Sequence, residues 1–480
     1  MAGLQCPKRL WYETNRRDEV PPYDAATQAI FEQGHEVGRL ARGLFPGGIE
    51  IARDQLDWAA AVLATREAVV RRVPLYEAAF VHAGAGCRVD VLVPVESDLW
   101  DLIEVKSSTS PKDEYLEDVA FQAWVLRGAG IRLRRTLLCR INSSYVRRGA
   151  LDPRSLFALD DLTDPVGVKL AALSEEIVRL QRVVELKAPP EVAIGPHCSS
   201  PHGCPLVPSC WSGIPEESVF TLHRGGRRSW DLFHATVVEL VGIPDAFELT
   251  DRQMIQVAAA RRREPHVDRA VLDLFLAKLE FPVHYFDLES LASAVPPFDG
   301  ARPYQQIPFQ FSLRVVDRPD AEPRATSFLA EGSGDPRPAF LAALRLAIQP
   351  RGSIVAFNAP FEIRCVSDAA ESNPSDRDWA AELKPRFVDL LEPFSSFAYY
   401  HPAQLGSASL KSVLPVLSGR GYEGLEIQEG QAAASEYLRS IQPETPAGER
   451  ARIRMALLEY CGRDTEGMVE IVRALERLLA

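Results

Sequence analysis

Long apolar segments are missing from this sequence of 480 residues. No run reaches 18 consecutive apolar residues, so no transmembrane helix is expected. Lys8 and Arg9 are not followed by an apolar segment, so no secretory signal is expected and the protein is predicted to be cytoplasmic. A basic excess is also missing, because 54 Lys and Arg stand against 66 Asp and Glu, for a net charge of −12. This balance argues against a general nucleic-acid coat protein, although basic groups can still be clustered locally.

Cysteine is scarce, with eight residues in the chain. Without an export signal, these cysteines are expected to be metal ligands or buried thiols rather than disulfides. The remaining composition, 46% hydrophobic and 25% charged, is that of an ordinary globular protein. The chain is longer than a domain with one hydrophobic core usually is, so more than one domain is expected. We predict an α/β protein with domains at 1–212 and 281–480, joined by a helical connector at 213–280.

Two carboxylates end an apolar, aromatic run that begins at Val283. In a β-strand, residues i and i+2 point to the same face, so Asp287 and Glu289 are expected to project together. Two carboxylates about 4 Å apart repel by roughly 4 kcal/mol at an effective dielectric constant near 20. A protein keeps such a pair for a cation, a shared proton or contact with open water. Taken alone, the pattern is more often a strand that runs out into a polar loop.

A second acidic pattern lies in a predicted β-hairpin of residues 87–93 and 99–106, whose side chains alternate around a polar turn. Asp90 lies near the middle of the first strand, and Glu104 and Lys106 share one face of the second. An acid opposite Glu-x-Lys is the arrangement that a one- or two-metal nuclease needs. The acids hold Mg²⁺, and the lysine orients the attacking water and offsets charge at the phosphate. Glu-x-Lys alone is most often a solvated strand face.

Further residues near this hairpin strengthen the metal-site interpretation. Glu77 lies on the preceding predicted strand, and Gln122 lies on the following predicted helix. Between residues 121 and 150 the chain has no acid and seven arginines, which are Arg127, Arg132, Arg134, Arg135, Arg140, Arg147 and Arg148. This basic segment is either a solvated face or, beside the predicted site, a surface that contacts phosphates.

A loop rich in proline and glycine carries three cysteines within 13 residues, namely Cys198, Cys204 and Cys210. Thiolates on such a loop usually bind a soft metal. Three ligands are one short of a closed tetrahedral site, and Cys6, which also precedes a proline, is the first candidate for the fourth. His197 or His202 could complete a zinc site instead.

Residues 1–212 resemble the RecB/AddB-type nucleases of the PD-(D/E)xK superfamily, in the branch that carries a [4Fe–4S] cluster. The resemblance implies a restriction-endonuclease-like fold. The residues that match its catalytic motif are Asp90, Glu104, Lys106 and Gln122. Those that match its cluster ligands are Cys6, Cys198, Cys204 and Cys210. The family often has a metal-binding His or Glu on its first helix, where His35 and Glu36 are both candidates. The cysteine spacing is looser than in familiar members, so Zn²⁺ remains the alternative to the cluster.

The C-terminal half places more acids in order along the chain. Asn358-x-x-Phe361-Glu362 follows a short predicted strand, and Tyr460 and Asp464 share one face of a predicted helix. With Asp287-x-Glu289, this half resembles the DEDD exonucleases, the DnaQ-like branch of the ribonuclease-H fold. The resemblance implies a mixed sheet, 3′→5′ polarity and two Mg²⁺ or Mn²⁺ ions.

The resemblance also implies a role for each matching residue. Tyr460 orients the attacking water, and the metal ligands are Asp287, Glu289, Asp464 and Glu362. Glu362 stands where most of these enzymes have aspartate. Asp389 could substitute for it, although that position usually serves packing and loop geometry in the family.

The two halves together resemble a family of uncharacterised bacterial proteins, a likeness that carries no function. The sequence therefore predicts a metal-dependent nuclease with two active sites, acting on DNA more than on RNA, in repair or defence. The alternative is a non-catalytic nucleic-acid-binding protein that uses inactive nuclease folds and a structural metal. In the connector we predict helices over 230–241 and 267–279, and Arg261-Arg262-Arg263 faces either nucleic acid or solvent.

Overall fold

The computed structural model describes residues 1–51, 57–371 and 373–480. The chain divides into two compact units, unit 1 of residues 1–212 with 293–305, and unit 2 of residues 213–292 with 306–480. The sequence analysis predicts a separate connector over 213–280, whereas these residues belong to unit 2. Within the described ranges, no helix is both long and apolar enough to cross a membrane.

Unit 1 is built on a six-stranded mixed sheet. Its strands, in both chain and sheet order, are β1 (Ile49–Glu50), β2 (Leu75–His82), β3 (Ala85–Pro94), β4 (Leu99–Lys106), β5 (Arg132–Ile141) and β6 (Phe157–Asp161). The pairs β1–β2 and β4–β5 are parallel, and the other neighbours are antiparallel. The predicted hairpin is confirmed, because β3 and β4 pair through Val91 and Ile103. Both faces of this hairpin are buried, because Leu92 and Leu102 join one core cluster while Val91 and Ile103 join another.

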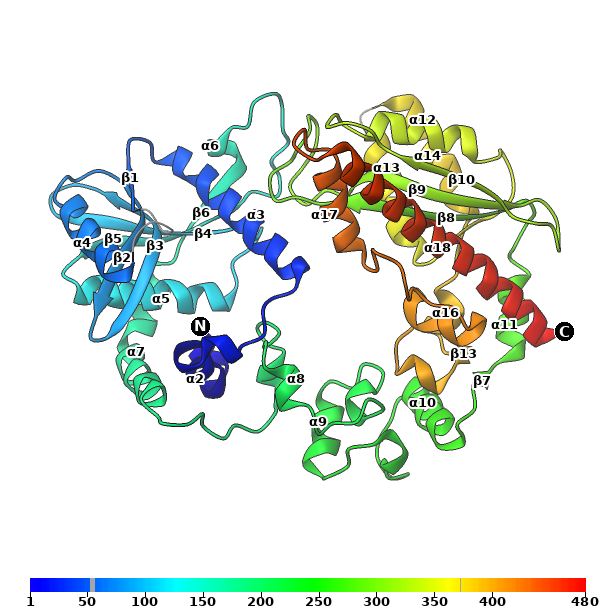
Figure 1. Cartoon of the computed structure of the whole chain (residues 1–480), viewed down its shortest axis with the longest axis horizontal. Helices are drawn as coiled ribbons and strands as arrows, with labels where there is room; N and C mark the ends of the chain where they lie inside the picture. Colours follow the sequence, from blue (N-terminus) through cyan, green and yellow to red (C-terminus); the bar gives the residue numbers. More distant parts are fainter. Residues whose placement is uncertain (52–56, 372) are drawn as a thin grey trace. The chain divides into compact units, whose positions relative to one another are not determined.

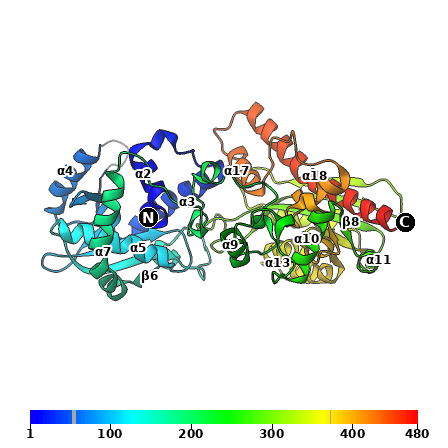
Figure 2. The same cartoon turned by 90° about the horizontal axis from the view of Figure 1, so that it is seen from below.

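The helices of unit 1 are α1 (Ala2–Gln5), α2 (Pro7–Asn15), α3 (Ala25–Ala41), α4 (Trp58–Val69), α5 (Asp113–Gly128), α6 (Pro153–Leu156), α7 (Thr163–Val184) and α8 (Val207–Cys210). Helices α5 and α7 lie side by side (Figure 1, Figure 2). Their apolar faces join the core cluster that contains Ala78, Leu102 and Val119. The loop 293–305 also packs here, because Ala294 and Val295 are buried in a second cluster with Val37 of α3.

Unit 2 is built on a five-stranded sheet of order β10–β9–β8–β11–β12. In chain order the strands are β8 (Val283–Leu291), β9 (Ile307–Val316), β10 (Arg324–Leu329), β11 (Ile354–Ala356) and β12 (Phe387–Asp389). The pairs β10–β9 and β9–β8 are antiparallel, while β8–β11 and β11–β12 are parallel. A separate two-stranded pair joins β7 (His266–Val267) and β13 (Tyr399–Tyr400).

The helices of unit 2 are α9 (Arg227–His234), α10 (Asp251–Arg262), α11 (Arg269–Leu276), α12 (Arg337–Ala347), α13 (Ala359–Ala370), α14 (Pro374–Leu383), α15 (Glu392–Ser395), α16 (Leu410–Ser418), α17 (Gly430–Ser440) and α18 (Ala447–Leu479). Helix α18 runs across β8 and β9 (Figure 1). Phe286 and Leu288 of β8 are buried with residues of α12 and α13. Because side chains alternate along a strand, Asp287 and Glu289 lie on the other face, beside α18.

The helices of the former connector differ from the prediction. Helix α9 ends at His234, so the predicted helix over 230–241 is too long, and α10 was not predicted. Thr250 and Gln253 form a capping box at the start of α10. At the other end of α10, Arg261 forms an ion pair with Asp245 and donates hydrogen bonds to the carbonyl oxygens of Val241 and Ile243. The side chain of Arg261 therefore stabilises the local fold.

Candidate metal centres

Three side chains of unit 2 converge between β8 and α18. Ligand atoms of Asp287, Glu289 and Cys461 all lie within 4.8 Å of one another. Glu289 and Cys461 are buried, and Cys461 Sγ donates to Asp287 Oδ2 at 3.3 Å. The two carboxylates come from one face of β8, as the sequence predicts, whereas the thiol comes from the helix that covers them. This geometry is suited to holding a divalent cation.

Two hydrogen bonds fix α18 against the sheet at this point. Gln310 Nε2 of β9 donates to the carbonyl oxygen of Leu457 at 2.7 Å, and Ser312 Oγ lies 2.7 Å from Thr465 Oγ1. The helix is thereby held over the length that carries the tyrosine, cysteine and aspartate of the site. These contacts with β9 hold the helix so that Cys461, between the predicted Tyr460 and Asp464, reaches Asp287 of β8.

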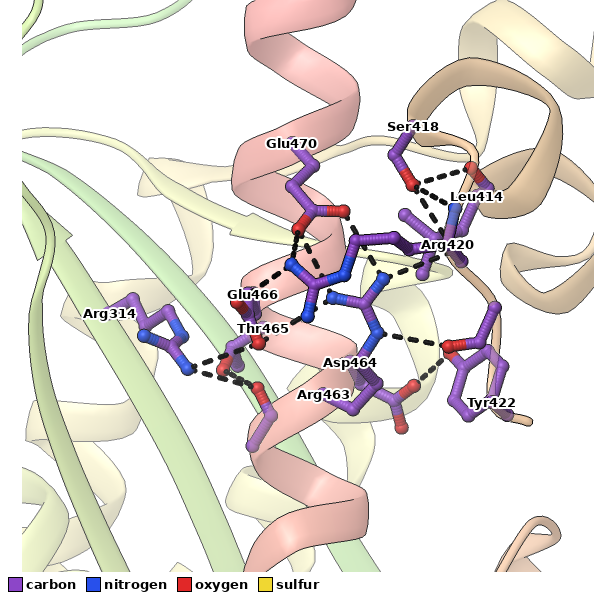
Figure 3. Close-up of polar contacts among 12 residues, drawn as sticks. Arg314, Leu414, Ser418, Arg420, Tyr422, Arg463, Asp464, Thr465, Glu466 and Glu470 are labelled. Carbon is purple, nitrogen blue, oxygen red and sulfur yellow. Dashed lines mark hydrogen bonds and ion pairs between the residues drawn. The ribbon is translucent and has the colours of Figure 1, made fainter. Parts of the chain in front are cut away.

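Asp464 lies beside the predicted Tyr460 and two further groups, Tyr422 and Lys411. Tyr422 donates its hydroxyl to Asp464 Oδ1, while the neighbouring Arg463 turns away and binds Glu470 (Figure 3). Lys411 Nζ lies 5.7 Å from the ring centroids of both Tyr422 and Tyr460. Tyr460 is buried with its ring beside that of Tyr422. The site therefore has two tyrosines and one lysine around its acids.

Glu362 lies near the start of α13 and is 4% exposed. Its Oε2 atom is buried and has no hydrogen-bond partner among the described residues. Asp389, the alternative from the sequence, accepts from the backbone amides of Asn358 and Leu391 through Oδ1, at 2.9 and 3.0 Å. Asp389 thus holds the strand-to-helix loop, and Glu362 is the acid with an unused oxygen. This arrangement favours Glu362 as the ligand.

The electrostatics of these acids reflect burial and mutual repulsion. Burial raises the pKa of Asp287 well above its usual range, and the charges of Asp464, Glu289 and Glu362 raise it further. Burial and the charges of Asp464 and Glu362 raise the pKa of Glu289, with Lys411 opposing. Burial raises the pKa of Glu362 to about 8 and that of Asp464 to about 6, although Tyr422 opposes the second shift. A bound divalent cation would relieve this repulsion, and carboxylate oxygens suit Mg²⁺ or Mn²⁺.

The predicted residues of unit 1 also come together, and hydrogen bonds join Glu104, Lys106, Asp118 and Gln122. Lys106 Nζ donates to Glu104 Oε1 at 2.6 Å and to Asp118 Oδ2 at 2.8 Å. Gln122 Nε2 donates to Glu104 Oε2 at 2.7 Å. Asp90 Oδ2 accepts from the backbone amide of Val105 at 2.7 Å. The network satisfies both oxygens of Glu104 within the protein.

Charge and burial compete in this network. Burial raises the pKa of Asp90 to about 6 and that of Glu104 well above its usual range. Burial would also raise the pKa of Asp118, but Lys106 outweighs it and the pKa is lowered. Lys106, between two acids, has its pKa raised despite burial. Asp118 is thus a member of this site that the sequence analysis missed, although it lies one helical turn before Gln122.

The remaining predicted residues of unit 1 lie around this site in different environments. Five of the seven arginines between 121 and 150 bind acids or carbonyl groups of the protein, namely Arg132, Arg134, Arg135, Arg140 and Arg147. The side chains of Arg132, Arg134 and Arg135 are nevertheless exposed beside their acids. Glu77 binds Arg42 at 3.4 Å, and its charge raises the pKa of Asp90. His35 and Glu36 are exposed on α3.

The four predicted cluster ligands of unit 1, Cys6, Cys198, Cys204 and Cys210, line one pocket together with Lys8, His197 and apolar residues. The backbone amide of Cys204 donates to the carbonyl oxygen of Cys198 at 2.9 Å. Gln5 Nε2 donates to the carbonyl oxygens of His197 and His202 at 2.7 and 2.6 Å, which ties the N-terminal turn to the cysteine loop. A pocket lined by four thiols fits an iron–sulfur cluster or a zinc ion.

The histidines near these thiols differ in position. His197 lines the same pocket, so it remains available to a zinc site. His202 points its Nε2 towards Glu114 at 3.6 Å and has a side chain that is 66% exposed. His202 is therefore the weaker candidate for a metal ligand.

One comparison with known families gives a match. A family described as a domain of unknown function, DUF2779, matches residues 284–409. The match includes Asp287, Glu289 and Glu362 but ends before α16, so the tyrosine and aspartate of α18 lie outside it. No curated protein matches the chain.

Proposed function

We propose that unit 2 is a metal-dependent exonuclease that degrades nucleic acid, with DNA expected before RNA, in the 3′→5′ direction. The grouping of acids around Asp287 carries this proposal: ligand atoms of Asp287 and Glu289 lie within 4.8 Å of each other, and the charges of Asp464 and Glu362 raise the pKa of both. Its sheet, in which three antiparallel strands are followed by two that run parallel to β8, agrees with the mixed sheet that the ribonuclease-H resemblance implies.

The four acids would hold two Mg²⁺ or Mn²⁺ ions, which supply positive charge for hydrolysis of a phosphodiester. Tyr460, buried beside the acids, would orient the attacking water. Tyr422 would keep Asp464 ionised and oriented through its hydroxyl. Lys411, whose charge lowers the pKa of Glu289 and Asp464, would add positive charge at the substrate side of the acids.

The test uses purified full-length protein with Mg²⁺ or Mn²⁺ and single-stranded DNA or RNA labelled at either end. A 3′→5′ enzyme releases the 3′ label first and shortens the 5′-labelled strand progressively. Asp287→Ala should reduce turnover by at least about 100-fold, the loss typical of removing one electrostatic group that acts on the reacting centre. Asp273→Ala, an exposed acid on α11, is the matched control. Equal activity of the two variants would refute the assignment.

For unit 1 we propose a nuclease-like domain whose four cysteines hold a [4Fe–4S] cluster, with Zn²⁺ as the alternative. Asp90 and Glu104 would hold Mg²⁺ and Lys106 would orient water if this site cuts DNA. The closed network around Glu104 favours the second candidate, a non-catalytic nucleic-acid-binding role. The two differ in one measurement. Catalysis by unit 1 predicts residual cleavage in Asp287→Ala that disappears when Glu104→Ala is added, whereas a binding role predicts no cleavage in Asp287→Ala and binding that weakens with salt.

A further inference from the structure

Cys461 is the one member of the acidic site of unit 2 that an oxygen-only cation does not explain. Its side chain is 0% exposed, and its sulfur lies within 4.8 Å of ligand atoms of both Asp287 and Glu289. The thiol contacts Asp287 through both the carboxylate and the carbonyl oxygen, at 3.3 and 3.8 Å. Mg²⁺ takes oxygen ligands, whereas thiolates select softer ions such as Zn²⁺.

A comparison with another cysteine of the same unit shows why this position is unusual. Cys365 is also 0% exposed, but it lies in an apolar cluster with residues such as Phe286 and Leu288. A buried free cysteine in such surroundings behaves as a small apolar side chain. Cys461 instead faces two carboxylates, and the nearby Glu362 has a buried oxygen without a partner among the described residues. Sulfur and oxygen donors are thus gathered where the protein supplies little neutralising charge.

We propose that Asp287, Glu289 and Cys461 form a mixed oxygen–sulfur site that takes Zn²⁺, and that Zn²⁺ bound there competes with Mg²⁺ and stops the nuclease. On binding, the thiol releases its proton to solvent and the sulfur forms a bond to the metal, with no change in oxidation state. Three protein ligands leave a fourth position for water, as in open zinc sites. The inhibitory part rests on the proposed function, whereas the metal site itself does not.

The binding test uses Co²⁺ as a probe, because a Co²⁺–thiolate bond gives an absorption band that Co²⁺ bound to oxygen lacks. Full-length protein, with the four-cysteine pocket as purified, is titrated with Co²⁺ in wild-type, Cys461→Ala, Cys365→Ala and Asp287→Asn forms. Wild-type protein and Cys365→Ala should give the same band. Cys461→Ala should lose one equivalent of it. Asp287→Asn retains the thiol but should also lose this equivalent, so the test survives if one variant misfolds. An unchanged band in Cys461→Ala and Asp287→Asn would overturn the site.

Displacement of Co²⁺ by Zn²⁺ then measures affinity. Removing the sulfur should weaken Zn²⁺ binding by more than the roughly 10- to 100-fold loss typical of outer-shell partners. In nuclease assays, the activity of each variant in Mg²⁺ alone is set as its own reference. Added Zn²⁺ should then inhibit wild-type protein and Cys365→Ala more strongly than it inhibits Cys461→Ala. A Cys461-dependent Co²⁺ band without nuclease activity in any metal would support the site and refute the proposed function. Nuclease activity without that band would do the reverse.

Discussion

Replacement of Glu362 by glutamine should make the metal-free protein more stable and the nuclease inactive. Glu362 is 4% exposed, and one of its oxygens has no partner within the described parts of the chain. Glutamine keeps the shape of the side chain and removes its charge. A residue whose replacement stabilises the fold while abolishing activity is present for the chemistry of the site.

The magnitude follows from the pKa of this carboxyl group, which rises from an ordinary value of 4.5 to about 8 in the folded protein. An acid with a raised pKa in the folded state costs stability progressively as the pH rises from the unfolded value to the folded one. At pH 7 the cost covers about 2.5 pH units at 1.36 kcal/mol each, or roughly 3 kcal/mol. Glu362→Gln should remove this cost at pH 7 and give no gain at about pH 4, where the carboxyl is protonated in both states.

Thermal unfolding between pH 4 and pH 8, in chelator and in Mg²⁺, measures the effect. A gain of roughly 3 kcal/mol corresponds to a rise in Tm of about 6–12 °C for a domain of 150–250 residues. Mg²⁺ should stabilise the wild-type protein more than the variant, because the variant lacks one ligand. Glu382→Gln, an exposed glutamate on the neighbouring α14, is the control and should change neither curve. A variant that is less stable than wild type at pH 7, or that responds equally to Mg²⁺, would refute the reasoning.

Three further perturbations test the remaining features. Lys106→Met removes the cation between the buried Glu104 and the half-buried Asp118 and should destabilise unit 1 by about 3 kcal/mol in urea unfolding, and an unchanged midpoint would contradict the network. Cys198→Ser should remove the iron or zinc found by metal analysis and, for a cluster, the absorbance near 400 nm, whereas Cys139→Ala, which replaces a buried core thiol, should retain both. Tyr422→Phe removes the hydroxyl that keeps the pKa of Asp464 down, so the acidic limb of the pH–activity profile should move to higher pH, and an unshifted limb would count against that role.

Local patterns in the sequence predicted the strands that carry the acids. Alternation over 87–93 and 99–106 gives the β3–β4 hairpin, and the apolar run before Asp287 gives β8. The strand-to-helix junction before Glu362 is also present at β11 and α13. These predictions depend on side-chain period and turn residues within about ten positions, where sequence is most informative.

The site residues that the sequence did not predict are brought in by contacts between segments far apart in the chain. Cys461 lies 174 positions from Asp287, and Tyr422 lies 42 positions from Asp464. A buried cysteine or tyrosine on a helix has the same local pattern whether it faces a core or an acid. The start of α10 is different, because its capping box of Thr250 and Gln253 is a local pattern that the sequence alone contains.

The loop 293–305 has a consequence for experiments that divide the chain. It leaves β8, buries Ala294 and Val295 among residues of unit 1, and returns as β9. A fragment that stops at residue 212 therefore lacks apolar groups that its own interior needs, and a fragment that begins at 213 exposes them to water. Cutting the chain between residues 212 and 213 should therefore yield two poorly soluble fragments. A fragment of residues 213–480 in which a short glycine linker replaces loop 293–305 should instead express well.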